Sequence, residues 1–213
     1  MDKTDYQKKR IAQKLMKRFL LLLCFVFLCL GIVYLHFEKR VTRFDLPEGE
    51  LKWSNTRPEN AKMCIPAAFT DEQGQILGAY RINGKNHEAN KTMRMRVSLK
   101  GDIFFISRQW MGDYGFQQLT LVNNSKAMKF HDKRKSIRRA LCKDKDGAFI
   151  LQSNYPMTMS DFALEFGKRS TNATYLDMGE FGYGYIKNGF FTRHLYIWGY
   201  FSRDKQTNWI YIE

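Results

Sequence analysis

Two acidic side chains three positions apart are the clearest candidates for chemistry in this sequence. Asp177 and Glu180 follow an apolar stretch at residues 173–176 that predicts a strand, and Gly179 lies between them. A carboxylate just past a strand, beside glycines that let a backbone approach a ligand, is typical of an active site. Two such groups can act as general acid and general base if both face one cleft. The alternative is that Asp177 only holds backbone N–H groups in a turn.

Two adjacent arginines, Arg138 and Arg139, lie inside a second predicted strand, with the sequence S-I-R-R-A-L-C. Alternation along a strand places them on opposite faces, so one of them is expected to point inward. An inward arginine needs an anionic partner. That partner is either one of the two carboxylates or a bound phosphate. The basic residues between Lys129 and Lys135 are expected to form a solvated loop.

A third candidate, Lys85, follows an Asn-Gly turn signal and precedes His87. Lys85 could supply a cation near a phosphate, although the turn alone also explains the pattern. No dinucleotide, P-loop, serine-hydrolase or zinc-protease motif is present, so the cofactor stays unknown. The histidines are scattered singly, and no metal site is expected. Cys64 and Cys142 either form a disulfide or remain two buried thiols.

The net charge of +14 over 213 residues first suggests a nucleic-acid-binding protein. Residues 1–43, however, hold 10 Lys and Arg against 3 Asp and Glu, which is half of the excess in a fifth of the chain. The remaining basic residues form no recognisable nucleic-acid-binding motif. We therefore expect no nucleic-acid partner.

The apolar stretch at residues 19–37 predicts a transmembrane signal anchor. It contains no Asp, Glu, Lys or Arg, and its length is close to that needed to span a bilayer. Seven basic residues precede it, so residues 1–18 are expected in the cytoplasm and the C-terminal part in the periplasm or another extracytoplasmic space. A cleaved signal peptide is the alternative, but no small-x-small site follows the apolar stretch.

After the predicted anchor, residues 38–62 are expected to form a stalk and residues 63–213 one exported domain. Short apolar runs separated by turn residues predict hairpins at 94–107 and 137–152. One helix is expected from the capping box T-M-S-D, with Thr158 as its N-cap and Gly167 at its end. The predicted fold class is α+β: a single domain with a mixed, mostly antiparallel sheet and few helices, preceded by one N-terminal transmembrane helix.

Several motifs, in order, resemble the phosphodiester glycosidase domain family, which includes the uncovering enzyme and bacterial exopolysaccharide-related proteins. R-R-A-L-C-K-D-K-D-G corresponds to the family's Arg-Thr/Arg-Ala-Leu-Gly segment, and M-T-M-S-D-F-A corresponds to its M-T-L-x-E-L-A helix. N-A-T-Y-L-D-M-G-E-F stands where the family has N-A-L-N-L-D-G-G-G-S. The resemblance covers residues 62–190.

The resemblance implies a mixed-sheet α+β fold and hydrolysis of sugar-1-phosphodiester linkages in envelope glycans. It carries Arg139, Asp177 and Gly179 over by position. The family's Asn-Gly-Gly has become Pro66-Ala67-Ala68. Together with the residues above, this predicts Asp177, Glu180 and Arg139 as catalytic, and Arg138, Lys85 and Gly179 as ligand-binding.

The expected ligand is a carbohydrate phosphate or another anionic glycan. The membrane is expected as a second partner, contacted through residues 19–37. The alternative function is a non-catalytic envelope protein that binds acidic glycans or other membrane proteins.

Overall fold

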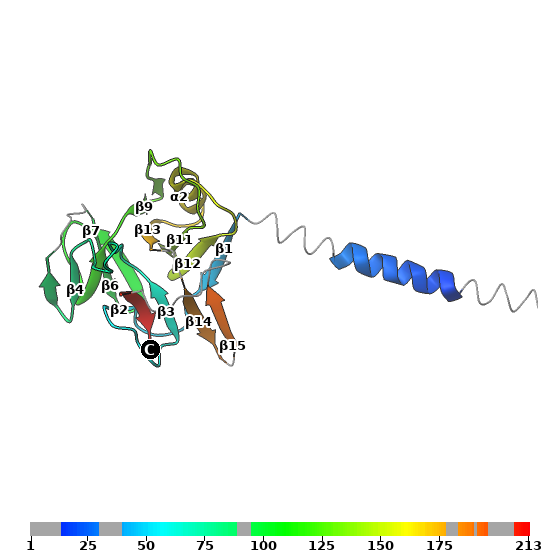
Figure 1. The fold of residues 1–213 in the computed structure, drawn as a ribbon, viewed down its shortest axis with the longest axis horizontal. Helices are drawn as coiled ribbons and strands as arrows, with labels where there is room; N and C mark the ends of the chain where they lie inside the picture. The colour runs from blue at the N-terminus through cyan, green and yellow to red at the C-terminus, as the bar shows by residue number, and fades with distance from the viewer. Residues whose placement is uncertain (1–13, 30–39, 89–94, 178–182, 190, 196–206) are drawn as a thin grey trace, which may run out of the picture. The chain divides into compact units, whose positions relative to one another are not determined.

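The computed structural model describes residues 14–29, 40–88, 95–177, 183–189, 191–195 and 207–213 (Figure 1). The chain divides into two units, Met1–Arg40 and Val41–Glu213. The second unit contains all the described strands and the helix that positions the site.

The described part of the first unit is helical over residues 14–29. Among the helices that the described residues form, none is both long enough and apolar enough to cross a membrane. The transmembrane anchor predicted for residues 19–37 is therefore wrong, and so is the single-pass localisation derived from it. Residues 30–37 lie outside the described residues.

The site is built on a six-stranded sheet with the order β1-β12-β11-β13-β9-β10. Its strands are β1 (Val41–Asp45), β12 (Ala148–Ser153), β11 (Arg139–Lys143), β13 (Asn172–Leu176), β9 (Thr120–Asn123) and β10 (Lys126–Ala127). The hairpin predicted at 137–152 is confirmed, because β11 pairs with β12 in antiparallel register.

Two five-stranded sheets complete the unit, with the orders β15-β14-β3-β16-β2 and β5-β4-β8-β6-β7. The first contains β15 (Phe191–Leu195), β14 (Gly184–Asn188), β3 (Met63–Pro66), β16 (Trp209–Ile212) and β2 (Lys52–Ser54). The second contains β5 (Lys85–His87), β4 (Tyr80–Ile82), β8 (Tyr114–Gln117), β6 (Arg96–Lys100) and β7 (Ile103–Ser107). The hairpin predicted at 94–107 is confirmed by the pairing of β6 with β7. Residues of the expected stalk supply β1 and β2, which pair with β12 and β16.

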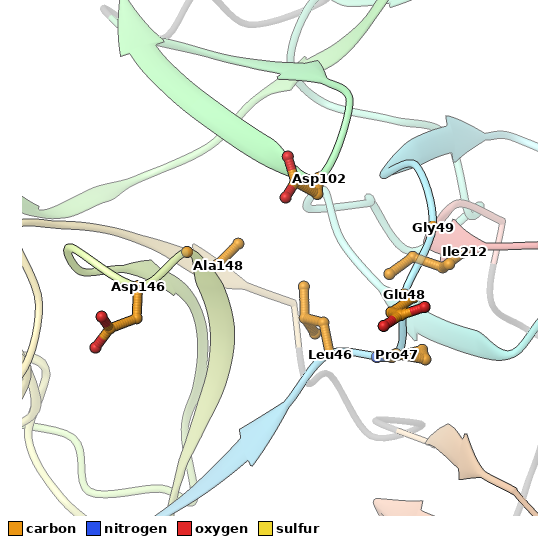
Figure 2. A pocket seen from close by; sticks show the side chains of 9 residues that line it. Leu46, Pro47, Glu48, Gly49, Asp102, Asp146, Ala148 and Ile212 are labelled. Atoms are coloured by element: carbon orange, nitrogen blue, oxygen red, sulfur yellow. The ribbon is translucent and has the colours of Figure 1, made fainter.

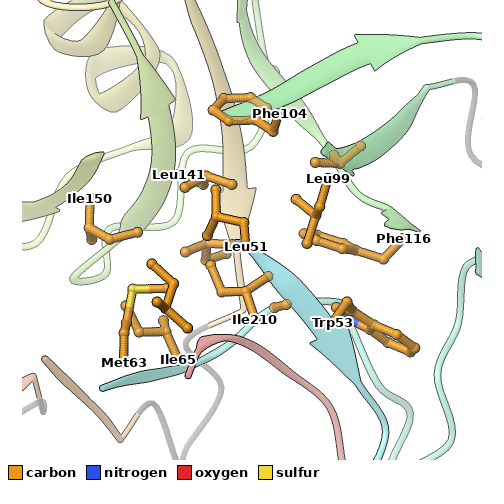
Figure 3. Close-up of a cluster of buried hydrophobic side chains, with 14 of the residues drawn as sticks. Leu51, Trp53, Met63, Ile65, Leu99, Phe104, Phe116, Leu141, Ile150 and Ile210 are labelled. Carbon is orange, nitrogen blue, oxygen red and sulfur yellow. The ribbon is translucent and has the colours of Figure 1, made fainter. Parts of the chain in front are cut away.

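The helix α2 (Met159–Gly167) covers one face of the six-stranded sheet near β9 and β13 (Figure 1). Its predicted N-cap is confirmed, since the Thr158 hydroxyl accepts from the Asp161 N–H at 3.1 Å. Phe162 and Phe166 are fully buried against this face, in a cluster with Ala140 and Phe149. The opposite face carries a second apolar cluster, which includes Leu141, Ile150, Met63 and Ile65 (Figure 3).

The predicted fold class is wrong: the unit is a β-rich structure rather than α+β with a mixed sheet. Every pairing found between the described strands is antiparallel, and α2 is the one α-helix in the described part of residues 41–213. Parallel neighbours need long crossover connections, usually helical. Among the described connections of residues 41–213, only the one from β12 to β13 contains an α-helix, and β11 lies between these two strands in the sheet. No described pair of neighbouring strands is therefore joined by a helical crossover.

We predict that Thr158→Ala lowers the free energy of unfolding by about 1 kcal/mol, because the first turn of α2 loses its side-chain cap. Denaturant unfolding measures the change. Thr158→Ser is the matched control: it keeps the hydroxyl and should stay close to the wild type. Equal losses in both variants would show that the methyl group, and not the cap, stabilises the helix.

Candidate functional site

The pairing of β11 with β13 brings the predicted arginines to the predicted carboxylate. In this antiparallel register Arg139 lies opposite Leu176, the residue before Asp177. The start of β11 therefore meets the end of β13. The Asp177 N–H donates to the Ala67 carbonyl at 2.9 Å, which joins this corner to the chain just after β3. Ala67 thus lies next to Asp177.

An open cavity of about 580 Å³ lies at this corner, and we call it the β13 cavity. Its charged lining consists of Arg134, Lys135 and Arg138 with Asp132 and Asp177. Its wall also contains Phe69, Tyr175 and Met159. Three cations against two carboxylates favour an anionic ligand, and the aromatic and thioether side chains provide apolar surface for a ring.

Arg138 is 4% exposed and is held by neutral acceptors in the described residues. Its Nε donates to the Met157 carbonyl at 2.9 Å and an Nη atom donates to the Arg134 carbonyl at 2.8 Å. Its backbone N–H donates to the Ser153 hydroxyl at 2.9 Å. A guanidinium held at several points is preorganised to receive an anion without losing side-chain freedom.

Arg139 is fully buried and does not line the β13 cavity. It donates from Nε and from an Nη atom to Gln152 Oε1, at 3.0 and 2.8 Å, and also to the Leu195 carbonyl. Burial lowers the pKa of Arg139 to about 9, while Tyr175 acts in the opposite direction. The guanidinium is therefore still charged at neutral pH, and its contacts place it in a structural position.

Tyr175 is 6% exposed and lies on the cavity wall, two residues before Asp177. Burial raises the pKa of the Tyr175 phenol, and the Asp177 charge also raises it. The charge of Arg138 and a hydrogen bond from its side chain lower the same pKa. Tyr175 therefore lies within electrostatic reach of both Arg138 and Asp177.

The loop at residues 129–136 is anchored to the beginning of α2. Ser136 and Met157 exchange two backbone hydrogen bonds, at 3.1 and 2.9 Å. The Ser160 hydroxyl donates to the Phe130 carbonyl at 2.7 Å and accepts from the Phe130 N–H. These contacts hold the loop at the rim of the cavity rather than leaving it as a detached solvated segment.

Within that loop, Asp132 and Arg134 form a surface ion pair. The Arg134 side chain lowers the pKa of the Asp132 carboxyl. Arg134 is already engaged by this carboxylate, whereas Lys135 has no such ion pair among the described residues. Lys135 is thus the better candidate to meet a ligand at the rim.

The other predicted site residues do not join this group. Lys85 lies exposed on β5, in a different sheet, and lines neither of the two cavities described here. His87, two residues further, stacks on Tyr80 with ring centroids 4.5 Å apart. Gly179 and Glu180 lie outside the described residues.

Three residues that line the cavity were not predicted from the sequence as site residues: Tyr175, Phe69 and Lys135. Tyr175 could have been found, because alternation along a strand places it on the same face as Asp177. Phe69 and Lys135 lie far from Asp177 in the sequence, and only the fold brings them to the same cavity.

A second cavity of about 260 Å³ is lined by Glu48, Asp102 and Asp146 (Figure 2). These carboxylates come from three separate segments, and Asp146 points its carboxylate away from Asp102 in Figure 2. Among the described residues, no three or more His, Cys, Asp or Glu side chains are grouped closely enough to hold a metal ion.

Cys64 and Cys142 are both buried free thiols, in different apolar clusters. Burial raises the pKa of Cys64 to about 12 and that of Cys142 well above the usual value. Both therefore remain protonated at neutral pH and act as small apolar side chains.

Comparison with known proteins identifies a distant relative in fold. No protein-family profile and no curated protein sequence matches the chain. Among solved structures, the catalytic domain of zebrafish N-acetylglucosamine-1-phosphodiester alpha-N-acetylglucosaminidase, auto-inhibited by its pro-peptide, is similar with a TM-score of 0.54. The match has 12% sequence identity and covers 78% of this chain and 73% of that chain. An identity this low shows similarity of fold alone, and the fold is similar to that of this phosphodiester glycosidase catalytic domain.

Proposed function

We propose that the β13 cavity hydrolyses a phosphodiester that links a sugar through its C1 atom to a second group. The observation that carries the proposal is the meeting of Asp177 with Arg138 in one open cavity, on a fold shared with an enzyme that acts on such linkages.

The reaction consumes one water molecule. Its oxygen bonds to C1 of the sugar, the bond between C1 and the phosphate oxygen breaks, and the phosphate leaves as a monoester of the second group. In the proposed mechanism Asp177 accepts the proton of the attacking water. The departing phosphate oxygen takes up one proton. From the sequence alone, Glu180 is proposed as the donor of this proton.

Arg138 is proposed to hold the phosphate. Its guanidinium is fixed before the ligand arrives, so it can stabilise negative charge on the leaving group with little reorganisation. Lys135 adds a second cation at the rim. Arg139, predicted as catalytic from the sequence, is proposed instead to position the start of β11 through Gln152 and Leu195.

A second candidate function is binding of acidic glycans without hydrolysis. The observation that favours it is the replacement of the family's Asn-Gly-Gly by Pro66-Ala67-Ala68. Ala67 and Ala68 are almost fully buried, so their side chains occupy space beside Asp177 that glycine would leave open.

We predict that Asp177→Asn lowers kcat by about 100-fold or more and leaves the melting temperature close to that of the wild type, because only the proton acceptor is lost. Release of N-acetylglucosamine from its methyl-1-phosphodiester measures the activity. Asp102→Asn is a control on a different turn and should keep full activity.

Binding of this diester without turnover by the wild type would decide for the second candidate function. Unfolding of the Asp177→Asn variant would assign Asp177 to the structural turn instead of to proton transfer.

We predict that Lys135→Ala raises KM for the same diester about fivefold, with kcat nearly unchanged, because an exposed cation at the rim attracts the phosphate in both ground and transition states. Lys133→Ala is the matched control, since Lys133 belongs to the same loop but does not line the cavity. Added salt should reduce the difference between wild type and Lys135→Ala. Equal effects of the two variants would reject a specific role for Lys135.

A further inference from the structure

Tyr175 lines the β13 cavity, and no step of the proposed hydrolysis uses its hydroxyl group. Tyr175 is 6% exposed and occupies β13 between the buried Thr174 and Leu176. Its ring packs against Phe69 with centroids 5.5 Å apart and an interplanar angle of 40°. The ring is therefore held from one side, and Tyr175 lines the same cavity as Arg138 and Asp177.

The charges around Tyr175 determine what its hydroxyl can do. Burial raises the pKa of the phenol, so at neutral pH it carries its proton and can donate a hydrogen bond. Tyr175 is also in contact with the guanidinium of Arg138, which is fixed by the Met157 and Arg134 carbonyls. A neutral donor and a fixed cation thus lie side by side on one wall.

A pair of this kind suits a tetrahedral or planar oxyanion. The guanidinium supplies charge and one direction of hydrogen bonding, and the phenol supplies a second donor that is already desolvated. A carbonyl or hydroxyl oxygen on a neutral ligand would gain less, because hydrogen bonds to charged groups are stronger than those between neutral groups. The contribution of the phenol should therefore depend on the charge of the ligand.

We infer that Tyr175 is a specificity-determining residue: with Arg138 it forms a two-donor site for the phosphate of the sugar ligand and distinguishes phosphorylated sugars from neutral ones. The inference rests on the proposed function, since it deepens the ligand class of the same cavity. In this role Tyr175 contacts only the phosphate and keeps its proton throughout the reaction.

Tyr175→Phe provides the test, because it removes the hydroxyl and keeps the ring that packs on Phe69. Two probes are compared by titration calorimetry on the full chain: N-acetylglucosamine-1-phosphate and the uncharged methyl N-acetylglucosaminide. We expect the variant to bind the phosphorylated sugar about tenfold more weakly than the wild type does. We expect its affinity for the uncharged sugar to be unchanged.

Tyr155→Phe is the matched control, since Tyr155 is 38% exposed and does not line the cavity. It should bind both probes as the wild type does. Thermal melting of both variants checks that the fold is kept.

Equal affinity of wild type and Tyr175→Phe for the phosphorylated sugar would overturn the inference and leave the proposed function standing. An equal loss for both probes would also overturn it, since the hydroxyl would then contact the sugar and not the phosphate. Failure of the wild type to bind the phosphorylated sugar at all would overturn the inference and the proposed function together.

Discussion

The buried guanidinium of Arg139 joins two sheets, and the geometry of the whole corner depends on it. Its donors reach Gln152 on β12 of the six-stranded sheet and the Leu195 carbonyl on β15 of a neighbouring sheet. Gly184 on β14 makes room for this contact, because a Cβ there would lie 3.3 Å from an Arg139 Nη atom and 3.1 Å from the Cys64 carbonyl oxygen. A buried cation is tolerated only when hydrogen bonds replace its lost hydration, so the surrounding acceptors fix the relative placement of the strands.

With Arg139 turned toward the neighbouring sheet, strand alternation turns Arg138 to the other face. There it meets the loop at residues 129–136 and the beginning of α2, and it takes its acceptors from the Arg134 and Met157 carbonyls. The two adjacent arginines thus have different structural roles. Arg139 connects two sheets through its hydrogen bonds. Arg138 lines the open cavity and is held in place by backbone carbonyls.

The distant structural relative shares the arrangement of strands, while the residues in the cavity decide the chemistry. The Ala67 carbonyl accepts from both the Asp177 N–H and Gln118 Nε2. The backbone beside Asp177 is therefore partly engaged by the protein's own donors and packed by methyl groups. In the proposed function, ligand recognition falls on side chains that line the β13 cavity, chiefly Arg138, Tyr175 and Lys135.

By itself, the sequence determined the features that depend on neighbouring residues. The Thr158 cap, the end of α2 and the hairpins β6–β7 and β11–β12 follow from local turn, cap and alternation signals, and each was predicted correctly. The transmembrane prediction was wrong, since none of the helices that the described residues form is both long enough and apolar enough to cross a membrane. Tertiary structure alone decided that all described pairings are antiparallel, that Lys85 belongs to another sheet, and that Arg138 and not Arg139 faces the cavity. These outcomes depend on contacts between segments far apart in the chain. A strand has two opposite faces, and the local pattern of residue types does not determine which face a distant loop covers.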